Sequence, residues 1–278
     1  MNISFIVLTY NRPDALLAVL RSLASQCQPQ DQIIIADDGS RMESVQRVRE
    51  QAPRFFCPVL HVWHEDRGFT ASAARNRAAL QASAPYLVFL DGDCVPGPCF
   101  AANHRRLAEP GCFVNGSRVL LNSQLTQSVL SSQINLAQMP AGYWLGAWLR
   151  GQANKLHHLI PWPLAWRIAH RSFKWRGIRS CNFGLWREDF FAVNGFDQVY
   201  QGWGHEDADL VLRLHHVGLA RKNGFLATEV FHLWHPESPR LREQENRARV
   251  MARRNLGTIR ADLGLSEIVG AEGILTAL

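Results

Sequence analysis

The stretch ISFIVLTYNRPDALLAVLRSLASQCQPQDQIIIADDGS, residues 3–40, decides the expected fold. It opens with a β-branched run, Ile3–Thr9, and continues with Asp14–Ser25, in which leucines recur at helical spacing. It closes with a second strand-like run, Gln32–Ala36, followed by a turn-rich Asp-Asp-Gly-Ser. This order predicts a βαβ unit.

The alternation of strand and helix patterns continues along the first third of the chain. We expect a strand at Val59–Trp63, a helix over about Ala71–Ala84 and a strand at Tyr86–Leu90. The sequence therefore predicts an α/β fold with a mostly parallel central sheet flanked by helices. Ligands bind beyond the carboxyl ends of such strands, where the polar residues stand: Thr9–Asn11, Asp37–Ser40 and Asp91–Asp93.

Asp91-Gly92-Asp93 directly follows the apolar run at Tyr86–Leu90. Two carboxylates separated by one residue can share a hard cation such as Mn²⁺ or Mg²⁺, which takes oxygen ligands. Such a cation would neutralise the charge that builds on a departing diphosphate. An ordinary turn is the alternative explanation of this tripeptide.

Asp38 and Arg75 also allow two interpretations each. Asp38 can cap the following helix, or its carboxylate can accept a hydrogen bond from a bound base. Arg75 belongs to a helix that opens near residues 70–72, and it can reach a phosphate or lie on a solvated face.

The segment Asn194–Asp209 is dense in glycine, aromatic and acidic residues. Glycines on both sides of Trp203 suit a loop that approaches a ligand closely. Glu206 and Asp207 should occupy the first turn of the next helix, where the helix dipole favours the ionised, proton-accepting form. Helix capping is the plainer alternative, and the Gly-Trp-Gly setting favours catalysis.

His232 and His235 follow a strand-like stretch, Ala227–Phe231. Imidazoles three residues apart at a strand end can complete a metal site, although histidines are often structural. The spacing does not choose between the two residues.

The composition permits a cytoplasmic protein with an acidic partner. The 278 residues carry a net charge of +6, and the six cysteines include no C-x-x-C pair or zinc-like grouping. No run reaches the roughly 18–20 apolar residues of a membrane span, and the start resembles a strand more than a signal peptide. The positive charge indicates nucleotide phosphates, nucleic acid or an anionic lipid surface.

The middle of the chain, from Pro110 to Arg187, contains nine Lys or Arg and no Asp or Glu. Helical projection of Trp162–Trp175 places Arg167, Arg171 and Lys174 on one face and apolar residues on the other. Such a helix suits a membrane interface with anionic lipid, so we expect peripheral attachment to the inner face of the cytoplasmic membrane. A core-packing helix with a solvated basic face is the alternative.

Taken in order, these motifs resemble those of family 2 glycosyltransferases of the GT-A fold, from Ser4 to about Pro236. The resembling elements are S-F-I-V-L-T-Y-N-R, A-D-D-G-S, A-R-N-R-A, F-L-D-G-D and N-G-F-D-x-x-Y-x-G-W-G-x-E-D-x-D-L. The last is similar to the carboxyl-terminal motif of β-1,4-galactosyltransferases and bacterial chondroitin-type polymerases.

The resemblance implies a role for each matching position. Asp207 would deprotonate the acceptor, and Glu206 would orient the acceptor or the donor sugar. Asp93 with His232 or His235 would hold Mn²⁺ or Mg²⁺. The nucleotide-sugar donor would lie against the remaining positions: Thr9, Tyr10, Asn11, Arg12, Asp38, Arg75, Asp91, Gly92 and Trp203.

The resemblance predicts an inverting, metal-dependent transfer of a hexose or N-acetylhexosamine from a UDP-sugar to a saccharide or lipid-linked saccharide. The expected setting is bacterial cell-surface polysaccharide or lipopolysaccharide synthesis, without a nucleic-acid partner. Two alternatives remain: a nucleotidyltransferase on a similar sheet, and a noncatalytic basic lipid- or nucleic-acid-binding protein.

We expect one catalytic domain made of four segments. Residues 1–112 form the nucleotide-sugar-binding half, and residues 113–180 form a basic, Trp-rich segment that faces the acceptor or a membrane. Residues 181–240 form the catalytic and acceptor half, and residues 241–278 form a helical tail.

Overall fold

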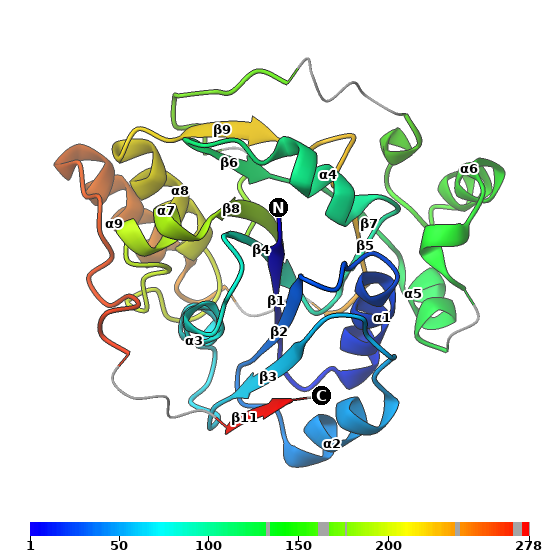
Figure 1. The fold of residues 1–278 in the computed structure, drawn as a ribbon. Coiled ribbons are helices and arrows are strands. Elements are labelled where there is room, and N and C mark those ends of the chain that lie inside the picture. Colours follow the sequence, from blue (N-terminus) through cyan, green and yellow to red (C-terminus); the bar gives the residue numbers. More distant parts are fainter. Residues whose placement is uncertain (132–133, 161–166, 176, 237–239, 269–273, 278) are drawn as a thin grey trace.

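A computed structural model of the chain describes residues 1–131, 134–160, 167–175, 177–236, 240–268 and 274–277. Within these residues the central sheet has eight strands in the order β11-β3-β2-β1-β4-β8-β6-β9. Figure 1 shows this sheet in the middle of the molecule, with helices on both of its faces. The predicted α/β class is confirmed.

The first third of the chain forms the parallel half of the sheet. Strands β1 (Ile3–Thr9), β2 (Gln32–Asp37), β3 (Val59–Trp63) and β4 (Tyr86–Asp91) alternate with helices α1 (Pro13–Ala24), α2 (Met42–Gln51) and α3 (Ala71–Leu80). Strand β1 pairs in parallel with both β2 and β4, and β2 pairs in parallel with β3. The carboxyl ends of β1, β2 and β4 therefore meet at one edge, as predicted from the alternation.

The rest of the chain extends the sheet and adds a smaller one. Strands β8 (Asn182–Trp186), β6 (Cys112–Asn115) and β9 (Ala220–Asn223) continue beyond β4, and β8 is antiparallel to it. Strands β5 (Cys94–Pro96), β10 (Val230–His232) and β7 (Arg118–Leu120) form the second sheet. The remaining helices are α4 (Phe100–Leu107), α5 (Ser123–Leu130), α6 (Ala141–Leu149), α7 (Arg187–Ala192), α8 (Glu206–His216) and α9 (Glu243–Leu256), with the 3-10 turns η1 (Leu136–Gln138) and η2 (His157–Leu159).

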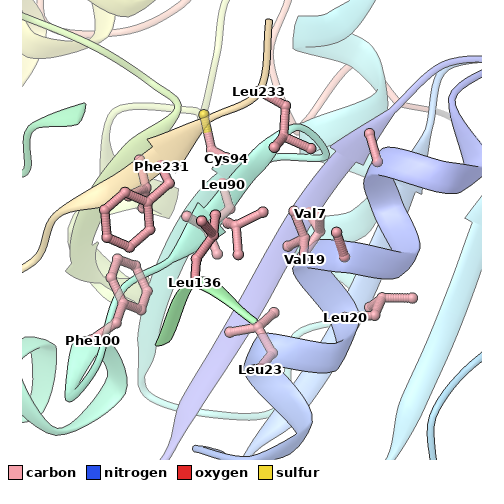
Figure 2. Close-up of a cluster of buried hydrophobic side chains, with 14 of the residues drawn as sticks. Val7, Val19, Leu20, Leu23, Leu90, Cys94, Phe100, Leu136, Phe231 and Leu233 are labelled. Carbon is pink, nitrogen blue, oxygen red and sulfur yellow. The ribbon is translucent and has the colours of Figure 1, made fainter. Parts of the chain in front are cut away.

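Apolar side chains fill both sides of the central sheet. Phe5 and Val7 of β1 face one cluster with α1, whereas Ile6 faces a second cluster with α3 and α8, as the period-two geometry of a strand requires. Figure 2 shows Val7 and Leu90 against Val19 and Leu23 of α1. Coverage of both faces explains why the parallel strands are almost continuously apolar.

Three secondary-structure predictions need correction. The strand expected at Ala227–Phe231 lies at Val230–His232. In the tail, the helix covers only Glu243–Leu256, and β11 (Ile274–Ala277) then pairs antiparallel with β3.

The third correction concerns the helix predicted at Trp162–Trp175. Its residues 161–166 lie outside the described part, and residues 167–175 contain no helix. Arg167 donates to the carbonyls of Asn223 and Phe225, and Arg171 donates to the carbonyl of Gly218. Two of the three basic side chains thus contact backbone carbonyls, and the two-faced helix is wrong for the described residues. No helix in the described ranges is long and apolar enough to cross a bilayer.

Candidate active site

The turn after β4 depends on Gly92. Its N–H donates to the Leu8 carbonyl at 2.6 Å, and a Cβ at this position would lie only 2.7 Å from that oxygen. Glycine therefore allows the turn to lie against β1 and to fix the directions of the flanking Asp91 and Asp93.

Three basic side chains converge on the carboxylate of Asp93. Oδ2 lies 3.2 Å from Arg12 Nη1 and 3.2 Å from His235 Nε2, and Oδ1 lies 3.8 Å from His232 Nε2. Strand register explains the convergence, because His232 in β10 pairs with Cys94, the residue after Asp93. The structure places both His232 and His235 beside Asp93, so the choice between them as a metal ligand stays open.

This donor set fits a divalent cation. One carboxylate and two imidazoles, with ring centroids 5.1 Å apart, are ligands that transition-metal ions accept. Burial lowers the pKa of His232, and the nearby Arg118 adds to the effect. A lowered pKa favours the neutral imidazole, which is the form that binds metal.

Two thiols beside this turn were missed by the sequence reasoning. Ligand atoms of Asp91, Cys94 and Cys181 lie within 4.8 Å of one another, and so do those of Asp93, Cys94 and His232. Cys94 and Cys181 are both buried. They lie far apart in the chain, so a search for short Cys spacings could not find them.

Arg75 links the turn at Asp91–Asp93, which we call the acidic turn, to the acidic pair Glu206–Asp207 at the start of α8. Its guanidinium is buried and lies 2.8 Å from Asp91 Oδ1 and 3.4 Å from Glu206 Oε1. The solvated-face interpretation of Arg75 is therefore wrong. The neighbouring Asn76 donates to the Phe196 carbonyl at 2.7 Å and accepts from the Phe196 N–H at 2.9 Å, which anchors the Asn194–Asp197 motif to α3.

Glu206 and Asp207 form the first turn of α8, as predicted. Asp207 accepts hydrogen bonds from the N–H of Ala208 at 2.7 Å and of Ser180 at 3.3 Å. Burial, aided by the charge of Asp207, raises the pKa of Glu206 to about 7, and burial also raises the pKa of Asp207. The helix dipole favours the ionised forms, but desolvation acts in the opposite direction and raises both pKa values.

The loop before α8 contains three residues with positive φ, two of which are glycines. Gly202, Gly204 and His205 have φ values of 74°, 104° and 74°. Trp203 is partly exposed, and the Arg240 guanidinium lies 4.6 Å from its ring centroid. Asn246 of α9 donates to the Gly204 carbonyl at 3.0 Å, so the tail helix supports this loop.

The residues expected at the base pocket lie together at the ends of β1 and β2. Thr9 is buried, and its carbonyl accepts the N–H of Asp38 at 3.0 Å. The Asn11 N–H donates to Ser40 Oγ at 2.8 Å, while Tyr10 is exposed and its hydroxyl donates to Asp66 at 2.8 Å.

Asp38 and Asp37 differ in their surroundings. Asp38 accepts from both the N–H and the hydroxyl of Thr70, at 2.9 and 2.5 Å, so it bridges β2 to the start of α3. Asp37 is held by His61 Nε2 at 2.8 Å and by the Ser40 N–H at 2.7 Å.

A mostly parallel sheet with this acidic edge defines a GT-A-type fold. The chain belongs to glycosyl transferase family 2, whose family model matches residues 4–179. A second family model, described as the N-terminal domain of galactosyltransferase, matches residues 164–235, which include the Gly-Trp-Gly loop. The resemblance drawn from the motifs is confirmed in both parts.

Individual relatives agree with this assignment. The chain is 29% identical over 248 residues to validoxylamine A glucosyltransferase of Streptomyces hygroscopicus subsp. limoneus, covering 78% of this chain and 48% of that protein. It is 26% identical over 270 residues to chondroitin synthase of Escherichia coli, covering 88% of this chain and 36% of that protein. The chain thus spans about half of the first relative and less of the second.

Solved structures support the fold. The structure of GalNAc-T7 with UDP, GalNAc and Mn²⁺ has a TM-score of 0.54 and 14% identity, covering 91% of this chain and 48% of that one.

Proposed function

We propose that this protein is an inverting, metal-dependent glycosyltransferase that moves a hexose or N-acetylhexosamine from a UDP-sugar to a saccharide hydroxyl. The observation that carries the proposal is the position of Arg75, between Asp91 of the acidic turn and Glu206 of the α8 pair. A metal-binding turn and a proton acceptor on the two sides of one site are what a displacement at a sugar carbon requires.

On the donor side, Asp93, His232 and His235 would hold Mn²⁺ or Mg²⁺. When bound, the cation supplies Lewis-acid stabilisation of the departing diphosphate. Thr9, Tyr10, Asn11 and Asp38, at the ends of β1 and β2, would line the base and ribose pocket. Asp91 would lie near the ribose and the metal, while Arg12, Arg75 and Gly92 would lie nearer the diphosphate.

On the acceptor side, Asp207 takes the proton from the attacking hydroxyl. Its two backbone hydrogen bonds hold the carboxylate in one orientation. Glu206 orients the acceptor or the donor sugar, and Trp203 supplies an aromatic face beside them. One attack opposite the leaving group inverts the anomeric centre, so an α-linked donor gives a β-linked product.

The comparisons support the donor and the metal in this proposal. A protein of the same fold has been solved with UDP, GalNAc and Mn²⁺, and one relative is a glucosyltransferase. A chondroitin synthase among the relatives favours a saccharide acceptor in cell-surface polysaccharide synthesis. The anionic membrane surface drew on two observations, the acid-free basic segment Pro110–Arg187 and the helix expected at Trp162–Trp175, and the described half of the second is not helical.

One assay separates this proposal from its alternatives. The protein is incubated with Mn²⁺ and, in turn, UDP-glucose, UDP-galactose and their N-acetyl forms. Released UDP supports a glycosyltransferase, released pyrophosphate supports a nucleotidyltransferase, and neither product supports a noncatalytic binding protein. The residues after β1, Tyr10-Asn11-Arg12-Pro13, already argue against the glycine-rich loop of nucleotidyltransferases.

A further inference from the structure

Three half-buried cations, Arg118, Lys155 and Arg179, gather beside the site without a role in the scheme above. We call them the basic cluster. Lys155 Nζ donates to the Arg118 carbonyl at 3.5 Å. The Cys181 thiol, two residues beyond Arg179, raises the pKa of the Arg118 guanidinium, which agrees with their proximity. Burial and the neighbouring charges of Arg179 and Arg118 lower the pKa of Lys155, which agrees with this proximity.

The basic cluster borders both halves of the site. Ser180, the residue after Arg179, donates its N–H to Asp207. Cys181, whose thiol raises the pKa of Arg118, lies within 4.8 Å of an Asp91 oxygen, measured between ligand atoms. Arg118 also stands on β7, the strand that pairs with β10 and His232. The cluster is therefore on the Asp207 side of the acidic turn.

The charge of the basic cluster is only partly compensated, because Asp91 and the nearby thiols raise the pKa of Arg118 while burial and Arg179 lower that of Lys155. Across the described residues, no carboxylate lies within 4 Å of any of its three cationic groups. The segment that supplies all three, Pro110 to Arg187, contains no Asp or Glu.

Glu229 interacts with Lys155, but its carboxylate accepts from the Ser117 hydroxyl at 2.5 Å and from the N–H groups of Leu226 and Ala227 at 2.8 and 3.1 Å. Glu229 raises the pKa of Lys155 by less than burial and the charge of Arg179 lower it.

Half-buried cations without a counterion in direct contact cost free energy, and an anionic ligand offsets that cost. We propose that the basic cluster binds an anionic group of the acceptor, a uronic acid carboxylate or a sugar phosphate, while the attacking hydroxyl lies at Asp207. Guanidinium groups recognise either anion through charge-assisted, often bidentate hydrogen bonds. This inference rests on the proposed glycosyltransferase function and specifies its acceptor.

The test is calorimetric titration of the protein, preloaded with UDP and Mn²⁺, with three probes: methyl β-D-glucuronide, methyl β-D-glucoside and glucose 6-phosphate. We expect at least one anionic probe to bind about tenfold more tightly than the neutral glucoside, the equivalent of one modest ionic contact. Whichever anion is preferred identifies the carboxylate or the phosphate as the natural group. Equal affinities, including no detectable binding of any probe, overturn the proposal.

Variants assign the preference to these residues. Lys155→Gln and Arg179→Gln should each reduce the preference severalfold and leave the affinity for UDP unchanged, which also shows that the site is folded. Arg150→Gln is the matched control, because Arg150 comes from the same acid-free segment but is exposed and, among the described side chains, bonds only to Gln152. If the variants lose UDP affinity and keep the sugar preference, the cluster serves the donor diphosphate and the proposal is wrong. Absence of UDP release from every UDP-sugar would instead count against the proposed function, which the binding titration does not measure.

Discussion

Arg253 of α9 donates to Asp209 Oδ1 at 2.7 Å, and this bond fixes the tail to the helix that carries Glu206 and Asp207. The same guanidinium donates to Asp197 Oδ2 at 2.7 Å. Both aspartates are fully buried, and both belong to the Asn194–Leu210 motif. The motif therefore contains two kinds of acid: Asp197 and Asp209 hold the structure, whereas Glu206 and Asp207 face the site.

Replacing Arg253 should destabilise the fold strongly. Arg253→Leu removes the cation that Asp197 and Asp209 share, although Asp209 keeps its ion pair with Arg213 at 2.8 Å. Breaking a buried pair by removing one partner costs about 3–5 kcal/mol. Urea denaturation followed by tryptophan fluorescence measures the change in unfolding free energy. Arg254→Leu, on an exposed position of the same helix, should change it by less than about 0.5 kcal/mol. Similar losses in the two variants would mean that Arg253 does not anchor the tail.

Replacing Asp207 should remove the proton acceptor and preserve the donor site. Asp207→Asn keeps the side chain's size, so we expect kcat to fall by at least about 10²-fold with UDP affinity nearly unchanged. Asp14→Asn is the control, because Asp14 also lies in the first turn of a helix and accepts from the next N–H, at 2.8 Å. Near-normal turnover of Asp207→Asn would show that another group is the base.

The pH dependence of transfer should reflect the buried Glu206–Asp207 pair. Burial favours the protonated forms and raises both pKa values, that of Glu206 to about 7. Since protonated Asp207 cannot accept the hydroxyl proton, activity should fall on acidification at a higher pH than for an exposed aspartate. The two groups titrate together, so the profile of kcat/KM between pH 4.5 and 9 gives values for the pair.

In Glu206→Gln the carboxyl group with the pKa near 7 is removed, so the acid limb should reflect Asp207 alone and move to lower pH. An unmoved limb would show that the pair is not coupled in the working enzyme.

Metal dependence should distinguish the two histidines. Asp93→Ala should abolish Mn²⁺-dependent UDP binding, because it removes the anionic ligand. His232→Ala and His235→Ala, measured separately, should each weaken Mn²⁺ by at least about tenfold if that residue is a ligand. His170→Ala is the control and should leave the affinity for Mn²⁺ unchanged, because His170 is exposed and lies beside Arg221 of β9, at the edge of the central sheet. Full activity in excess EDTA would exclude the metal scheme.

The sequence predicted the elements that short-range patterns determine. Strands β1 to β4 and the start of α8 follow from apolar periodicity and from acidic residues at a helix start, so their positions were right to within a few residues. The motif order also identified the family. What was missed depends on contacts between distant segments: Arg253 with Asp209, Cys94 with Cys181, and Arg118 with Lys155.

Two further differences have physical causes. The helix dipole alone favours low pKa values at Glu206 and Asp207, whereas burial raises both, and burial is a property of the packed molecule that the sequence does not show. The pattern at Trp162–Trp175 has helical periodicity, yet Arg167 and Arg171 donate to the backbone carbonyls of Asn223 and Gly218, which are distant in the chain. Tertiary hydrogen bonds override a helical pattern in such a segment.

Because Cys94 lies beside the acidic turn, we expect thiophilic metal ions to inhibit the enzyme at low concentration. Cys94 lies next to Asp93 and, with His232, completes a set of sulfur, oxygen and nitrogen ligands within 4.8 Å of one another. Zn²⁺ binds thiolate and imidazole more tightly than Mn²⁺ does, so micromolar Zn²⁺ should inhibit activity supported by millimolar Mn²⁺.

Cys94→Ser should relieve this inhibition by about tenfold or more and should retain activity with Mn²⁺, because serine keeps the size of the buried side chain. The control is Cys112→Ser, since Cys112 is also buried but stands on β6, outside both ligand groups. The measurement is the Zn²⁺ concentration that halves UDP release, compared among the wild type and the two variants. The same value in all three proteins would show that Zn²⁺ acts through Asp93 and the histidines alone, and that the thiol has no part in metal selection.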